Sequence, residues 1–398
     1  MKNTTMKQEL KRMKFEIAQK EWINGKINQQ EAACLLGVSD RTFRRYLRAV
    51  EEEGLDGLID ARLDQVSHLR APVDEVFALT DKYKRLHTGW NVKHFYSWYK
   101  NKYEGLRSYT WVKDRLQEAG LVKKLPGKGK HRKHRERAAM AGMMLHQDGS
   151  SHRWIPDKEW DLIVTMDDAT SEHYSMFFVR EEGTASSFRG LREAIEKKGL
   201  CCSLYTDRGS HYWTTPEAGG KVDKENLTQF GRAMHQLGIE MIPAYSPEAR
   251  GRSERAFKTH QGRLPQELAF HGIIDMASAN KYLQETYMPA FNKEFMEAPH
   301  IEDEAFVPYI GLGLEDILCE QHARIVDKNN CISYKGKRLQ IPPDNLRYHY
   351  VKVEVRVHEY PNLEMAIFHG PRCLARYDRR GQLKNTKIKA KKLEEAVA

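Results

Sequence analysis

The sequence WDLIVTMDDATSEHYSMFFVR, residues 160–180, contains two apolar runs separated by a short polar segment. Each run has the length of a buried strand, and the polar segment between them predicts a turn. The preceding segment MMLHQDGSSHRW, residues 143–154, has the pattern of a further short strand. The middle of the chain is therefore expected to hold three consecutive strands.

Helices and strands alternate after this point. The elements expected next are an amphipathic helix at 187–197, a buried strand in CCSLYTDRGSHY at 201–212, a helix at 229–237 and a strand in IEMIPAY at 239–245. Three strands followed by this alternation predict a mixed α/β sheet flanked by helices. In a ribonuclease-H-like sheet, Asp148 on the first strand and Asp207 at the end of the fourth converge with an acid on the helix after the fifth.

That third acid is Glu254, in the segment AYSPEARGRSERAFKTHQGRL at 244–264. Gly251 ends a loop, and Ser253 is expected to cap the helix. The apolar spacing predicts a buried side at Phe257, His260 and Leu264, up to the breaker Pro265, and an opposite side at Glu254, Lys258 and Gln261. Taken alone, Glu254 and Lys258 are typical of a solvated ion pair.

The N-terminal residues predict a helix-turn-helix. Three short helices are expected: one with Phe15, Ala18 and Trp22 at helical spacing, one in NQQEAACLLG ending at Gly37, and DRTFRRYLRAVEEEG capped by Ser39. The third helix is expected to bury Phe43, Tyr46, Leu47 and Val50 and to expose Arg41, Arg44, Arg45 and Arg48. Such an arginine face can enter a major groove of DNA.

A second helical block is expected at 73–122, with its last helix in YTWVKDRLQEAGLV capped by Ser108. On that helix the spacing predicts Tyr109, Val112, Leu116 and Ala119 inward and Thr110, Lys113 and Gln117 outward. We interpret the block as another helix-turn-helix. Its aromatic residues are expected in the core rather than stacked on bases.

Positive charge is concentrated in two segments of a chain whose formal net charge is +10. KKLPGKGKHRKHRER at 123–137 and the tail from Arg376 to Lys392 are too polar to fold alone. Such segments favour nucleic-acid phosphates, the alternative being a solubilising tail. The six cysteines form no CxxC pair and no eighteen-residue apolar window occurs, so a reducing, cytoplasmic location without membrane contact is expected.

Several motifs taken together resemble those of bacterial insertion-sequence transposases of the DDE class, with a retroviral-integrase-type catalytic core, and in particular the ISNCY group. These are EAACLLGVSDRTFRRY, HQDGS, YTDRGSHY, PEARGRSERAFKTHQGRLPQEL and AFNKEFMEAP, which together span most of the chain. The resemblance implies that Asp148, Asp207 and Glu254 are the catalytic, metal-binding acids. The 46 residues between the last two exceed the spacing of many integrases and leave Glu248 as a rival, but a helix fixes the direction of Glu254 better than a loop fixes Glu248.

The resemblance further implies two Mg²⁺ ions, with Mn²⁺ as a substitute, because hard cations prefer carboxylate oxygens. One of Asp167 and Asp168 is a candidate to support the ligands, and His211 is either a substrate contact or a surface histidine. No nucleotide-binding loop is present, and no other cofactor is expected. The predicted DNA contacts are Arg41, Arg44, Arg45, Arg48, Lys113, Lys130, Arg132, Lys133, Arg135, Arg252, Arg255 and Lys258.

The expected domain order is a helix-turn-helix domain (1–62), a second helical DNA-binding domain (73–122), a basic linker (123–139), a ribonuclease-H-like core (140–300), a connection (301–325), a small β-barrel (326–378) and a basic tail (379–398). These parts predict a nucleoid-associated transposase that binds terminal inverted repeats and target DNA as a dimer or higher multimer. It would cleave the ends and join the 3′-hydroxyls to the target. Two alternatives are a transposase-derived DNA-binding regulator without catalysis and a nuclease that cuts without joining.

Overall fold

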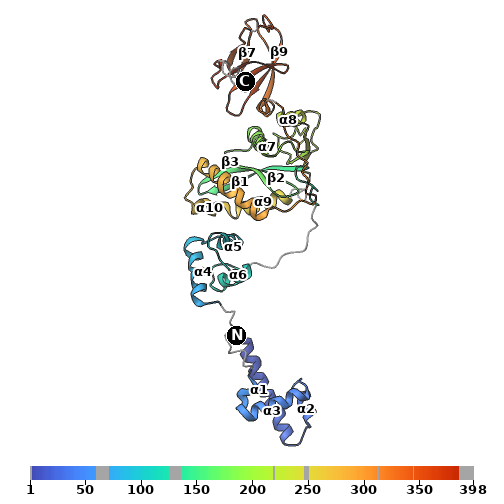
Figure 1. Cartoon of the computed structure of the whole chain (residues 1–398), viewed down its shortest axis with the longest axis vertical. Helices are drawn as coiled ribbons and strands as arrows, with labels where there is room; N and C mark the ends of the chain where they lie inside the picture. Colours follow the sequence, from blue (N-terminus) through green and yellow to red (C-terminus); the bar gives the residue numbers. More distant parts are fainter. Residues whose placement is uncertain are drawn as a thin grey trace, which may run out of the picture. The chain divides into compact units, whose positions relative to one another are not determined.

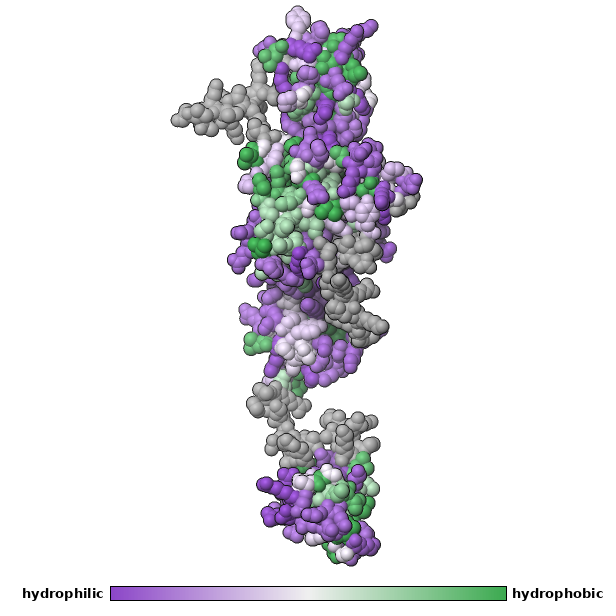
Figure 2. Space-filling view, turned by 90° about the vertical axis from the view of Figure 1, so that its right-hand side faces the viewer, coloured by the Kyte–Doolittle hydropathy of each residue, from purple (hydrophilic) through white to green (hydrophobic). Residues whose placement is uncertain are grey.

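The computed structural model of the chain describes residues 2–59, 71–124, 136–217, 220–245, 251–311, 313–343 and 345–384, with side chains from Gln8 onward. The chain divides into two compact units, Met1–Ala78 and Leu79–Ala398, and the succession of elements along it can be followed in Figure 1. No described helix is long and apolar enough to cross a membrane. On the face drawn in Figure 2, hydrophilic side chains are interspersed with apolar patches.

The first unit contains the predicted helix-turn-helix. Its helices are α1 (Lys2–Ile23), α2 (Gln29–Leu35) and α3 (Asp40–Glu53), followed by the 3-10 turn η1 (Gly54–Leu58). Asn28 and Glu31 form a capping box at α2, and the Ser39 side chain accepts a hydrogen bond from the backbone NH of Thr42. Phe15, Ala18 and Phe43 are buried together in the core, as the spacing predicts. Gly37 takes a positive φ of 67° in the turn between α2 and α3, a conformation that favours glycine.

The second helical block consists of α4 (Val73–Leu86), α5 (Val92–Asn101) and α6 (Tyr109–Glu118). Asn91 caps α5, and Ser108 caps α6 as predicted. Val112 and Leu116 are buried with Phe95 in the block's own core. The prediction was wrong for Tyr109 and Ala119, which are exposed. Tyr109 lies in the first turn and Ala119 is the C-cap, so both stand at the ends of a helix shorter than the apolar pattern suggested.

The central sheet has the order β3-β2-β1-β4-β5, with β1 to β3 antiparallel and β4 and β5 parallel to β1. Its strands are β1 (Met144–Ile155), β2 (Lys158–Asp167), β3 (His173–Val179), β4 (Ser203–Thr206) and β5 (Glu240–Pro243). This is the mixed sheet predicted from the sequence, although β1 has 12 residues instead of being short. β1 is long because it pairs with nearly the whole of β2 in a single hairpin.

Helices cover both faces of this sheet (Figure 1). The first face carries α7 (Thr184–Lys198) and α8 (Gln229–Leu237), which share a core with Leu145 of β1. The other face carries α9 (Gly251–Gln261), α10 (Leu264–Phe270), α11 (Met276–Tyr282), the π-helical turn η4 (Leu283–Tyr287) and α12 (Met288–Phe295). These pack on Leu162 and Val164 of β2. Burial on two faces makes the sheet a rigid base for side chains at its strand ends.

Two local expectations around α9 need correction. The helix already begins at Gly251, so Ser253 lies inside its first turn, 4% exposed, and is not the cap. Pro265 does not end a continuous helix, because α9 stops at Gln261 and Pro265 lies in the first turn of α10. Proline is well tolerated at that position, since the backbone NH it lacks has no partner within the helix there.

The C-terminal residues form two small sheets over one core. After α13 (Leu314–Ile317), a four-stranded sheet has the order β11-β10-β9-β6, and β7 and β8 form a hairpin. The strands are β6 (Glu320–Ile325), β7 (Cys331–Tyr334), β8 (Lys337–Gln340), β9 (Glu354–Glu359), β10 (Met365–His369) and β11 (Arg372–Tyr377). The hairpin turns at Lys335–Gly336, with φ of 44° and 75°. The sheets are not closed, so the expected β-barrel is not shown, and β6 lies in the segment expected to be a connection.

Candidate active site

Asp148 and Asp207 lie on neighbouring strands of the central sheet. β1 and β4 run parallel, and their last paired residues are His146 and Tyr205. Each aspartate comes two residues after its strand's member of that pair, so both lie just beyond the point where the pairing of the two strands ends. Asp148 is 6% exposed, and Asp207 follows the end of β4. The sheet therefore brings together two acids that are far apart in the sequence.

A buried tyrosine lies among these acids. Tyr212 is 1% exposed, and its hydroxyl accepts a hydrogen bond from Ser187 Oγ at 3.1 Å. Burial raises the pKa of Tyr212 well above its ordinary value, and the charges of Glu182, Asp148 and Asp207 raise it further. The hydroxyl therefore stays protonated among the three carboxylates, where it can donate a hydrogen bond.

Glu182 is a site residue that the sequence analysis missed. It lies between β3 and α7, and its backbone NH donates to Asp161 Oδ2 at 2.6 Å. Its carboxylate approaches the backbone beside Asp148, since a Cβ at Gly149 would lie 2.1 Å from Glu182 Oε2. The local sequence does not distinguish Glu182 from its neighbour Glu181. Only the packing of the turn between β3 and α7 against β1 brings the Glu182 carboxylate towards the aspartates.

His211 lies beside Asp207, on the same side as Glu182. A Cβ at Gly209 would lie 3.0 Å from both Asp207 Oδ1 and His211 Cε1, so glycine leaves room for the two side chains to approach. His211 Nε2 is buried, makes no hydrogen bond and lies 3.4 Å from Glu182 Oε1. His211 is therefore not an ordinary surface histidine, because its Nε2 is buried beside Glu182.

Glu254 stands exposed in the first turns of α9. The far end of α9 lies along β1, because Gln261 Nε2 donates to Ser150 Oγ at 3.0 Å. Ser150 is two residues beyond Asp148 on the same face, so α9 runs beside the strand that carries the first acid. The ligand oxygens of Asp148, Asp207 and Glu254 do not all lie within 4.8 Å of one another. In the described part of the chain, a different group of residues has its ligand atoms this close together.

Asp168 holds the beginning of α9. Its carboxylate is fully buried, accepts a hydrogen bond from His146 Nε2 at 2.6 Å and pairs with the guanidinium of Arg252. Burial alone would raise the pKa of Asp168, but the bond and charge of His146, with Arg252, hold it below its ordinary value. Asp168 therefore supports the helix of Glu254, whereas Asp167 binds the backbone NH groups of Gly142 and Thr170, each at 2.8 Å.

The predicted DNA contacts differ in how accessible they are. All four arginines of α3 are exposed, with Arg44 paired to Asp40 at 2.9 Å. Arg255 and Lys258 are exposed on α9, Arg252 is engaged by Asp168, and Lys113 pairs with Asp114 at 3.3 Å. The predictions for Lys130, Arg132, Lys133 and Arg135, and the loop residues Glu248 and Arg250, lie outside the described residues.

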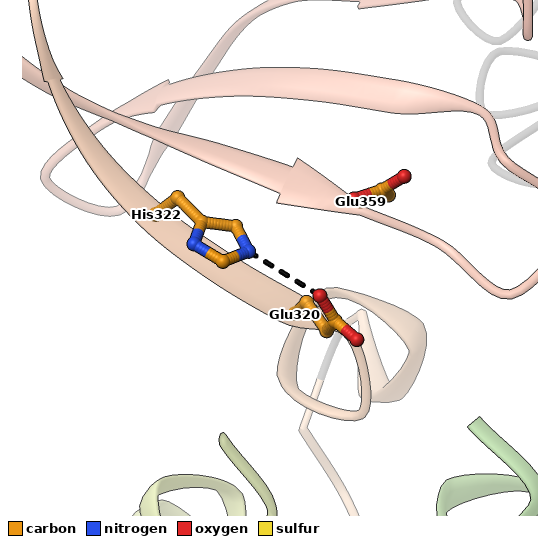
Figure 3. Close-up of side chains that lie close together, drawn as sticks. All are labelled: Glu320, His322 and Glu359. Carbon is orange, nitrogen blue, oxygen red and sulfur yellow. Dashed lines mark hydrogen bonds and ion pairs between the residues drawn. The ribbon is translucent and has the colours of Figure 1, made fainter. Parts of the chain in front are cut away.

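The group that does meet the 4.8 Å spacing lies in the C-terminal sheets and comprises Glu320, His322 and Glu359 (Figure 3). His322 Nε2 lies 3.3 Å from Glu320 Oε2. Glu359 already accepts hydrogen bonds from Tyr334 Oη at 2.6 Å and Lys335 Nζ at 2.5 Å. The lysine ammonium would compete with any cation for this carboxylate.

Comparison with known proteins identifies the class. A family model described as a helix-turn-helix domain matches residues 14–62. A protein of Sinorhizobium fredii predicted to be a transposase, y4bF, is 27% identical over 350 residues, covering 85% of this chain and 74% of its own. The transposase of insertion sequence IS1202 from Streptococcus pneumoniae is 28% identical, covering 53% of this chain and 44% of its own. The chain is thus a homologue of insertion-sequence transposases and contains a helix-turn-helix domain.

Solved structures of retroviral proteins are also similar. A chain of the simian T-cell lymphotropic virus intasome, solved in complex with the PP2A regulatory subunit B56 gamma, has a TM-score of 0.34 at 14% identity, covering 63% of this chain and 81% of its own. The catalytic core domain of HTLV-2 integrase, solved with magnesium, has a TM-score of 0.29 at 14% identity, covering 36% of this chain and 84% of its own.

Proposed function

We propose that this protein is a DNA transposase that binds the terminal inverted repeats of its element, cleaves the ends and joins the 3′-hydroxyls to target DNA. The observation that carries the proposal is the position of Asp148 and Asp207, each two residues beyond the last pair of the parallel neighbouring strands β1 and β4. Homology to transposases and the exposed arginines of α3 support it. We propose further that the protein acts on nucleoid DNA in the bacterial cytoplasm.

The residues at the strand ends fit a pair of Mg²⁺ ions, with Mn²⁺ as a substitute. Asp148, Asp207 and Glu254 offer hard carboxylate oxygens, which Mg²⁺ prefers, and these three residues would hold the ions. Bound ions would activate the attacking oxygen and offset charge on the leaving oxygen of a phosphodiester. The ligand oxygens of these three residues do not all lie within 4.8 Å of one another, so shared binding of the ions would require them to come closer.

The chain's own groups orient the DNA around these acids. Arg255 and Lys258 are exposed next to Glu254, where they can hold phosphates on both sides of the scissile bond. The Tyr212 hydroxyl and His211 line the side of Asp207, and His211 Nε2 can donate to a substrate oxygen there. We assign recognition of the DNA sequence to α3. We assign non-specific DNA contact, or contact with a second protomer, to the C-terminal sheets. For these sheets a closed barrel remains our expectation.

Cleavage and joining of a labelled element end separate this function from its alternatives. A transposase produces Mg²⁺-dependent cleavage followed by joining to an unlabelled target. A nuclease produces cleavage without joining, and a regulator produces end binding alone. Either of the last two patterns would overturn the proposal.

Glu182→Gln is expected to reduce end cleavage by about 10–100-fold, the range seen when a group supporting metal ligands is removed. End binding should not change, because Glu182 lies by the acids and not on a DNA-binding helix. Glu181→Gln is the matched control, since Glu181 is exposed one residue away. Equal effects of both changes, measured by single-turnover cleavage, would remove Glu182 from the site.

At least two chains are expected on a pair of joined ends, because one chain presents a single set of Asp148, Asp207 and Glu254 and two ends must be processed. The mass of the complex with paired ends, measured by light scattering, checks this. A stable, active complex containing a single chain would contradict it.

A further inference from the structure

Helix α5 of the second helical block packs on the core through one polar face. Asn91, His94 and Ser97 are three residues apart and therefore share a side of the helix. Asn91 Nδ2 donates to the Gly262 carbonyl at 3.0 Å, and His94 Nε2 lies 2.6 Å from Glu267 Oε1. Ser97 Oγ donates to Glu294 Oε2 at 2.6 Å. Each contact reaches a residue about 170 or more positions away in the sequence.

The central partner on the core, Glu267, is buried, and its carboxylate is fully engaged. The side chains of His94 and Glu267 are 1% and 9% exposed, and the second oxygen of Glu267 accepts from Tyr282 Oη at 2.5 Å. Arg263 makes two 2.8 Å hydrogen bonds to Glu294, the acceptor of Ser97. Buried polar groups cost free energy unless they are paired. Separation of α5 from the core would leave the Glu267 carboxylate without its hydrogen bond to His94. The polar face of α5 is therefore complementary to this part of the core.

Aromatic contacts extend the same interface. Phe270, at the end of α10, lies over a group of rings from the helical block, with ring centroids 5.4 Å from His87, 5.0 Å from Trp98 and 6.0 Å from Trp90. The His87 and Phe270 rings are nearly parallel, at 11°. Stacked and edge-to-face contacts of this kind stabilise an interface beyond the area they bury.

The interface lies at the end of the helix that carries Glu254. Gly262 and Arg263 directly follow α9, and Glu267 lies in α10. Arg252 and Asp168 fix the beginning of α9, so the helix is held at both ends, at one end by the sheet and at the other by the helical block. The block is also weakly basic, with nine Lys or Arg against six Asp or Glu in residues 73–122.

We propose that helices α4–α6 are a positioning element of the active site, which docks on the core of the same chain and presents a bound DNA end to that chain's Glu254. His94 and Glu267 are its central positioning residues. The proposal rests on the transposase function, because it names the double-stranded DNA end as the ligand that the block carries. Docking itself can be measured without any DNA chemistry.

Hydrogen exchange of the DNA-free full-length protein tests the docking. His94→Gln and Glu267→Gln should each raise exchange in both 92–101 and 262–270 by about a hundredfold, because each leaves a buried partner unpaired. The double variant should differ little from either single one. Unchanged exchange in strands β1 to β3 verifies folding, and Glu285→Gln, at an exposed position, is the control. Exchange that rises in only one of the two segments, or effects that add, would overturn the docking.

Mixed protomers test delivery within one chain. A chain with Asp148→Asn keeps His94 but cannot cleave, whereas a chain with His94→Gln keeps its acids but docks poorly. Docking within the chain predicts that the mixture cleaves no better than His94→Gln alone. Restored cleavage would show that one chain's helical block docks on the other chain's core, and would overturn the proposal. If the unaltered protein does not cleave at all, the transposase function fails while the exchange result still decides the docking.

Discussion

Asp148→Asn is expected to lower end cleavage and strand transfer by at least about a thousandfold, and Glu254→Gln is expected to do the same. Removal of one electrostatic stabiliser from an active site already costs about 10²–10³ in rate, and each of these acids is assigned to metal ions that act on both reacting oxygens. Asp148 lies on β1 beside Asp207, and Glu254 is on α9, which runs along the same strand.

End binding should survive both substitutions, because the arginines predicted to bind DNA lie on α3 in the other compact unit. A gel-shift titration in parallel with single-turnover cleavage separates the two effects. Asp303→Asn and Glu285→Gln are matched controls at exposed positions and should retain full activity. Full activity of Asp148→Asn or Glu254→Gln would remove that acid from the site.

Reversal of charge at Arg44 and Arg45 to Glu is expected to weaken binding of element ends by about a hundredfold at ~0.1 M salt. Both side chains are exposed on α3, the third helix of the helix-turn-helix, where Phe43 is buried and holds the helix in place. The salt dependence should also become shallower, by about one unit of slope for each DNA phosphate that an arginine no longer neutralises. Cleavage of ends supplied at saturating concentration should be retained.

The control for this change is reversal at Arg192, which is exposed on α7 and engaged in an ion pair with Glu196 at 2.8 Å. Affinity should change little for that variant. If Arg44 and Arg45 can be reversed without loss of affinity, then α3 faces protein or solvent and another element reads the DNA. Loss of helicity by circular dichroism would instead indicate unfolding, which the exposure of both side chains argues against.

The local patterns were sufficient to predict most elements of this chain. Apolar spacing and capping residues determined α2, α3, α6 and α8, because helix ends depend on nearby side chains such as Asn28, Ser39 and Thr228. The run at 160–180 predicted β2 and β3, since two buried strands and a short turn form a local hairpin. Asp148, Asp207 and Glu254 were proposed from their motifs, and their roles remain predictions.

Sequence alone determined which residue types the site has available and the elements that carry them. Only the tertiary structure decided which residues, distant in the sequence, come into contact. The contacts of Glu182 with Gly149 and Tyr212, and of His94 with Glu267, correspond to no periodic pattern in the sequence. The end of a helix at Gln261 and its restart at Leu264 were likewise set by packing on β1 and on α5, which overrode the continuous apolar spacing. Buried polar pairs are selected by the partners across an interface, and these partners come together only when the sheet and helices have assembled.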